Sequence, residues 1–169
     1  MVFQISKNIG IIHLSGMILE TIYGFIFSKN ILFDEIYIIS FLIIPFSWII
    51  CKDECIISYF VKKYKNPNYI LGNEPDNVKD ITDLFIDKNL YHIFYNINHI
   101  LRIISVIIVN NRTTKIFYFN PIFILYSFYV YDITYKLNYR ISLYPYFQII
   151  FSIYLFKIFY DILSNNLYT

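Results

Sequence analysis

Long apolar stretches, separated mostly by short polar connections, constrain this chain more than any other feature of its sequence. A helix needs about 20 predominantly apolar residues to cross the roughly 30 Å hydrocarbon core of a bilayer. Five stretches approach or reach this length: residues 9–27, 36–50, 90–109, 116–131 and 143–163. The sequence therefore predicts an all-α, polytopic transmembrane helical bundle of five helices, or of four if the third stretch stays at the interface.

Composition supports a single integral membrane domain. Only 15% of the 169 residues are charged, against about 25% in soluble domains, and mean hydropathy is +0.51. The net charge of +2 is too small to indicate nucleic-acid binding. Alanine is absent and Ile, Asn, Lys, Phe and Tyr are abundant, which is typical of an AT-rich genome. The lipid bilayer and other membrane subunits are therefore the expected partners.

The distribution of basic residues predicts the topology. Nine Lys and Arg residues fall in the connections on the side of the N-terminus, namely Lys7, Lys52, Lys62, Lys63, Lys65, Lys79, Lys88, Lys136 and Arg140. The opposite side has three, namely Lys29, Arg112 and Lys115. Because cytoplasmic connections carry the excess, we expect the N-terminus inside, the C-terminus outside and the long polar loop 62–80 on the inner side.

The second apolar stretch contains Pro45 and is short for a span if it stops at residue 50. We expect a continuous helix that extends beyond residue 50 and has a solvated end, with Cys51 and Cys55 on one helical face. Two thiols without a second Cys or Cys-His pair do not indicate a metal site, so the two cysteines are interpreted as small interfacial residues. Acidic residues near the end of the polar loop predict that a third helix begins near Ile81 and enters the membrane after Lys88.

Two of the predicted helices carry polar residues at helical spacing. On the third stretch a polar stripe shares about one third of the helical circumference, and it consists of Lys88, His92, Tyr95, Asn96, His99 and Arg102. The first stretch carries His13 and Glu20, with Gly16 and Gly24 on the same side to permit close approach. Charged groups in hydrocarbon are costly, so these faces should meet within protein.

We therefore expect the first and third stretches to be neighbours that run in the same direction. Glu20 should meet His99 or Arg102 in the membrane interior, and His13 should lie near His92 at the inner edge. The favoured interpretation is a structural seam that sets helix register. A proton or ion path is the alternative, because imidazoles and an intramembrane carboxylate exchange protons near neutral pH. A haem ligated by His13 with His92 or His99 is disfavoured.

No sequence motif of a common hydrolase, metalloprotease or nucleotide-binding enzyme is present, so a conventional enzyme is disfavoured and no catalytic residue is assigned. The predicted function is a non-catalytic integral membrane component of a larger membrane assembly. A small transporter, channel or proton-handling subunit, including an organellar respiratory-complex subunit, is the alternative. At the helix ends, Asp132 with Lys136 and Lys157 with Asp161 are expected to form i,i+4 pairs.

The segment 51–72, which reads CKDECIISYFVKKYKNPNYILG, resembles segments of small uncharacterised polytopic membrane proteins of large AT-rich DNA viruses. The resemblance covers about one eighth of the chain and carries no functional residue with it. It implies location in a host or virion membrane, such as the internal membrane beneath a capsid. An organellar inner membrane is the alternative location.

Overall fold

The computed structural model describes residues 2–75, 78–113, 120–135 and 140–166. Within these ranges every regular element is an α-helix, which confirms the all-α prediction. The helices are α1 (Val2–Ile26), α2 (Ile31–Ile50), α3 (Ile56–Lys65), α4 (Lys79–Thr82), α5 (Lys88–Thr113), α6 (Asn120–Tyr135) and α7 (Arg140–Asn166).

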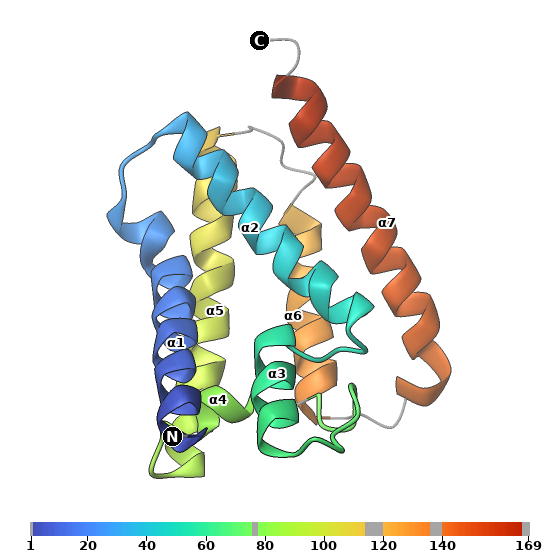
Figure 1. The fold of residues 1–169 in the computed structure, drawn as a ribbon. Coiled ribbons are helices and arrows are strands. Elements are labelled where there is room, and N and C mark those ends of the chain that lie inside the picture. The colour runs from blue at the N-terminus through green and yellow to red at the C-terminus, as the bar shows by residue number, and fades with distance from the viewer. Residues whose placement is uncertain (1, 76–77, 114–119, 136–139, 167–169) are drawn as a thin grey trace.

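The long helices form a bundle in which α1 lies along α5 and runs in the same direction (Figure 1). α2 leans across α5 and reaches α7, and α6 contacts both α5 and α7. The short helices α3 and α4 gather beside the beginning of α1. α1 and α2 diverge from the turn that joins them, and α5 contacts both (Figure 1).

Within the described residues, three helical segments are long and apolar enough to cross a membrane: Ser6–Ile26, Ile31–Ile50 and Lys88–Thr113. This length and composition are consistent with an integral membrane protein. The predicted fourth stretch begins in residues 114–119, which lie outside the described residues. Its described part belongs to α6, and the predicted fifth stretch lies within α7.

Large side chains fill the core between α2, α5, α6 and α7. Phe41 contacts Phe123 and Tyr126 edge to face, with ring centroids 5.5 and 4.9 Å apart. Such pairs are favourable beyond the area they bury, by about 0.5–1.5 kcal/mol. In a chain without alanine, close helix approach depends on glycine: a Cβ on Gly24 of α1 would collide with Ser105 of α5.

The prediction of a continuous second helix past residue 50 is wrong. α2 ends at Ile50, and Lys52 and Asp53 adopt left-handed backbone angles, with φ of 54° and 66°. The reason is that this acidic turn folds inward instead of entering solvent. Asp53 accepts hydrogen bonds from Tyr129 of α6 and Gln148 of α7. Cys51 and Cys55 therefore do not share a helical face.

Buried charge also organises the polar loop. Glu54 is buried and lies 2.6 Å from the ammonium of Lys62, and it accepts hydrogen bonds from the Tyr69 hydroxyl and the Gly72 amide. Both ends of the predicted loop 62–80 are helical, since α3 continues to Lys65 and α4 begins at Lys79.

The long helix begins at Lys88, the residue after which membrane entry was predicted, and the predicted start near Ile81 is wrong because Ile81 lies in the separate short helix α4. Asp80 does not extend a helix into the membrane, because its carboxylate turns toward His13 and Ser58. Asp87 begins α5 instead: its side chain accepts a hydrogen bond from the amide of Asn89, and its carbonyl accepts one from Tyr91.

The predicted pair of Lys157 and Asp161 is confirmed, with 2.8 Å between the ammonium and the carboxylate. The pair predicted for Asp132 involves Lys136, which lies outside the described residues.

A candidate site in the groove between α1 and α2

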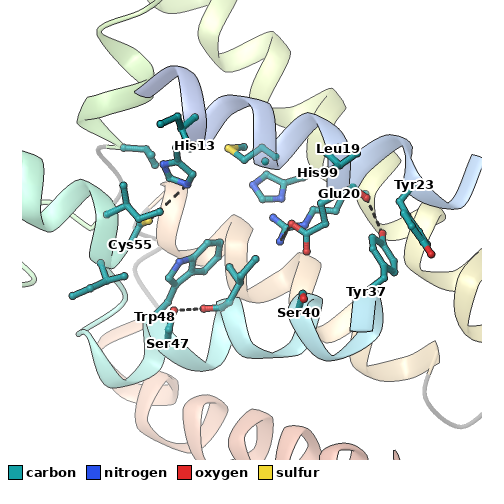
Figure 2. A pocket seen from close by; sticks show the side chains of 18 of the residues that line it. His13, Leu19, Glu20, Tyr23, Tyr37, Ser40, Ser47, Trp48, Cys55 and His99 are labelled. Carbon is teal, nitrogen blue, oxygen red and sulfur yellow. Dashed lines mark hydrogen bonds and ion pairs between the residues drawn. The ribbon is translucent and has the colours of Figure 1, made fainter. Parts of the chain in front are cut away.

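A groove of about 760 Å³ lies between α1 and α2. Its walls are mainly apolar, and its floor is formed by Tyr95, His99 and Arg102 of α5. Figure 2 shows His13 and Cys55 at one end, Tyr37 at the other, and Glu20 and His99 between them. The volume falls within the roughly 300–1,000 Å³ that is typical of ligand pockets.

An ion pair lies in the middle of the groove. Glu20 of α1 and Arg102 of α5 approach to 2.5 Å between Oε2 and Nη2, and the Arg102 side chain is only 2% exposed. The guanidinium also lies over the rings of Phe41 and Tyr126, at 5.3 and 5.6 Å from their centroids. These contacts compensate part of the cost of burying the charge.

His99 lies beside this pair. The Tyr95 ring contacts it edge to face at 4.3 Å, and its Nδ1 lies 3.5 Å from the Tyr126 hydroxyl. In the described part of the chain, the buried atoms without a hydrogen-bond partner include three at this place in the groove, His99 Nε2, Glu20 Oε1 and Arg102 Nε. Unpartnered buried polar atoms in one cavity indicate a place where water or a polar ligand group binds.

The predicted meeting of His13 and His92 is wrong. His92 is exposed, and its ring contacts Tyr91. His13 instead faces α4, because Gly10 lets the Asp80 backbone approach α1 more closely than a Cβ would allow. Asp80 thereby occupies the partner position that the sequence assigned to His92.

Two other sequence assignments also differ in the structure. Asn96 is exposed and lies 3.5 Å from the Tyr135 hydroxyl, away from the groove. Gly16 lines the groove, and a Cβ there would meet no atom within 4 Å. Only Gly24 therefore serves the close helix approach that was expected of both glycines.

His13 connects two side chains at the α3 end of the groove. Its Nδ1 lies 2.7 Å from Asp80 Oδ2, and its Nε2 lies 3.9 Å from Cys55 Sγ. The Ser58 hydroxyl donates a hydrogen bond to the other oxygen of the buried Asp80 carboxylate. Asp80 thus receives hydrogen bonds on both oxygens, which orients the His13 ring with its second nitrogen toward the thiol.

These contacts lower the pKa values of the Asp80 carboxyl and the Cys55 thiol. Burial raises the pKa of Asp80, but the hydrogen bonds from His13 and Ser58 outweigh it and lower the pKa below its usual value. Burial alone would also raise the pKa of the Cys55 thiol. The contact with His13 and the first amides of α3 outweigh burial, so the pKa of this thiol is lower than its usual value. Cys51, which lacks such partners, has a pKa raised by burial.

No family model, curated protein or solved structure matches this chain. The site is therefore interpreted from its own chemistry. Among the residues that the structure describes, no group of three or more His, Cys, Asp or Glu side chains is arranged to hold a metal ion. The imidazole nevertheless lies between the thiol and the carboxylate and contacts both of them.

Sequence reasoning missed Cys55, Ser58 and Asp80 as partners of His13. They are 42, 45 and 67 residues away from it along the chain, and no short motif joins them. The available signal was Gly10, which lies nearly one helical turn before His13 and marks a close approach of another backbone.

Proposed function

We propose that this chain is a multi-pass membrane protein that binds the acyl chain of a membrane lipid in the groove between α1 and α2. The observation that carries the proposal is an apolar groove between two helices that are each suited to cross a bilayer. Its walls include exposed apolar side chains, such as Ile12, which is 73% exposed, and Phe33 and Ile36. A groove with such an edge opens toward the hydrocarbon that would surround these helices.

The proposal includes five membrane crossings, by α1, α2, α5, α6 and α7, with the N-terminus inside. The alternating directions of these helices in Figure 1 support it. So do the large apolar side chains that α7 exposes, among them Ile149, Ile153 and Phe156. The excess of basic residues on the N-terminal side supports the orientation.

Lipid binding is tested by photocrosslinking in phosphatidylcholine vesicles that contain a phosphatidylcholine with a diazirine in its acyl chain. We expect crosslinks to wall residues of α1 and α2. Gly16→Leu extends a side chain into open space in the groove and should reduce these crosslinks severalfold. Ile153→Phe adds bulk to an exposed position on α7 and serves as the matched control, with groove crosslinks unchanged.

Crosslinks spread evenly over all exposed helices would contradict specific binding. Groove crosslinks that persist unchanged in Gly16→Leu would contradict the proposed location. Either result is read from the positions of the modified peptides by mass spectrometry.

Proton or ion handling is the second candidate function, and the unpartnered atoms of Glu20, His99 and Arg102 favour it. It predicts proton flux in liposomes that is lost in Glu20→Gln or His99→Gln. Vesicles that show no flux while the lipid crosslinks persist would favour lipid binding alone.

Membership of a larger membrane assembly is also part of the proposal. The resemblance of segment 51–72 to viral membrane proteins supports a host or virion membrane, and the AT-driven composition is equally compatible with an organellar subunit. Purification from the native membrane in mild detergent tests this point, since a stable assembly should retain stoichiometric partner chains.

A further inference from the structure

We propose that Cys55, His13 and Asp80 form a nucleophilic triad that transfers the acyl group of a lipid ester bound in the groove. This inference rests on the proposed binding of an acyl chain there, and it departs from the expectation of a non-catalytic protein. Its substrate class is a carboxylic ester with a long aliphatic acyl chain.

The order of contacts is that of an activated nucleophile. Cys55 Sγ lies 3.9 Å from His13 Nε2, and His13 Nδ1 lies 2.7 Å from Asp80 Oδ2. A thiol beside an imidazole that a carboxylate orients is a recurring arrangement for acyl transfer. The distance from sulfur to nitrogen suits a resting site, because catalytic contacts often shorten when substrate binds. Ser58 holds the second oxygen of Asp80 and thereby limits rotation of the carboxylate.

The position of Cys55 matches the position of an ester in a lipid. The candidate span of α2 ends at Ile50, and Cys55 lies just beyond it at the beginning of α3. α3 exposes Ile57 and Phe60 and carries Lys63 and Lys65 in its last turn, which is typical of a helix at a membrane surface.

The groove continues from this point toward the hydrocarbon. Cys55 lines it, and Glu20 lies seven residues, or about 10 Å, further along α1 than His13. An ester carbonyl at Cys55 would therefore place its acyl chain along the apolar walls, with the alcohol part directed to the surface.

The first amides of α3 supply donors for a developing negative charge. Cys55 is the N-cap residue of α3, and its side chain makes no capping hydrogen bond. The amides of Ile57 and Ser58 contribute to the lowered pKa of the Cys55 thiol. Amides in the first turn of a helix stabilise anions, so these donors can bind the oxyanion of a tetrahedral intermediate.

The reaction balances without a cofactor or an oxidant. Cys55 transfers its proton to His13 Nε2, and the sulfur forms a bond to the carbonyl carbon of the ester. The bond between this carbon and the alcohol oxygen breaks, and the alcohol leaves with the proton from His13. Water then attacks the thioester with His13 as the base, which releases the fatty acid and restores the thiol; an alcohol or amine in place of water would accept the acyl group.

The main test uses a p-nitrophenyl ester of an ω-alkynyl C16 fatty acid in phosphatidylcholine vesicles that contain the full-length protein. We expect a hydroxylamine-sensitive acyl adduct on Cys55, detected through the alkyne. Cys55→Ala should remove the adduct, and Cys51→Ala, the matched control, should retain it. His13→Gln should slow its formation by at least about 100-fold, the lower limit for loss of a general base.

Asp80 is a positioning residue, and its role is tested through a pH profile. The titratable groups that interact with Cys55 are His13 from α1, with Asp80 of α4 behind it, and Cys51 from the preceding turn. Alkylation of Cys55 by iodoacetamide should proceed at lower pH than alkylation of Cys51. Asp80→Asn should move the Cys55 profile to higher pH, whereas a purely structural aspartate would leave the profile of the folded protein unchanged.

The outcomes separate this inference from the proposed function. Groove crosslinks without any acyl adduct on Cys55 would overturn the triad and leave lipid binding in place. An adduct formed from p-nitrophenyl acetate, without groove crosslinks, would support the triad and contradict the acyl-chain groove. Crosslinking of each variant by the diazirine lipid shows that a loss of adduct is not a loss of fold.

Discussion

The contact between Gly24 and Ser105 supports a quantitative prediction about the packing of α1 on α5. A Cβ at Gly24 would collide with the Ser105 carbonyl and would lie 2.7 Å from Ser105 Oγ, which accepts a 2.8 Å hydrogen bond from the Gly24 amide. Ordinary contact begins at 3.4 Å, so Gly24→Ala must push the two helices apart by several tenths of an ångström at least. Overpacking of this kind costs about 1–3 kcal/mol, and a weakened hydrogen bond adds about 1 kcal/mol.

Helix propensity opposes this cost, since alanine is better than glycine within a helix by about 0.5–1 kcal/mol. The net expectation for Gly24→Ala is a loss of about 1–3 kcal/mol in the free energy of unfolding. Gly16→Ala is the matched control on the same helix, because its new methyl group meets open space. It should leave stability unchanged or raise it by up to about 1 kcal/mol.

The measurement is reversible unfolding in bicelles or mixed micelles, followed by helix content and by a fluorescence probe. Equal stability of Gly24→Ala and Gly16→Ala, within about 0.5 kcal/mol, would refute the argument that Gly24 sets the spacing of α1 and α5.

Two further predictions concern the polar end of the molecule. Glu54→Gln removes the carboxylate from a pair whose side chains are 1% and 4% exposed, and it should cost about 3–5 kcal/mol of unfolding free energy because Lys62 stays buried without its counter-charge. The control is Asp83→Asn, which should cost at most about 1 kcal/mol because both side chains of the Asp83–Lys65 pair are 24% exposed. Similar losses in the two variants would contradict the reasoning. Because the folded-state pKa of Asp80 is lowered, the stability that it contributes is present above the unfolded value of about 3.9 and is lost as the pH falls through the folded pKa. The thermal midpoint should therefore fall on acidification below about pH 4, by less in Asp80→Asn than in the wild type, and equal slopes for the two proteins would argue against this assignment.

The elements of this fold were largely predictable, and their ends were not. Apolar length indicates a helix because only a helix satisfies the backbone within a continuous apolar stretch in lipid. The ends depend on individual polar residues: α2 stops at Ile50 because Asp53 and Glu54 find partners inside the protein, and α5 begins at Lys88 because Asp80 is used elsewhere. A sequence lists these acidic groups without showing where their partners lie.

The same distinction applies to the site. The 3.6-residue period places His99 and Arg102 on one face of one helix, and the cost of charge in hydrocarbon requires that face to meet protein or water. The sequence by itself thus determined that this is an all-helical, membrane-compatible chain and that its first and third apolar stretches carry the polar faces. The sequence left Glu20 with two possible partners and assigned His13 to His92. Only the tertiary structure decided the actual pairs, Glu20 with Arg102 and His13 with Asp80, because helical period sets the side chains that share a face but not the register between helices. That register depends on the two close approaches at Gly10 and Gly24, which turn Glu20 to Arg102 and leave His13 between Asp80 and Cys55.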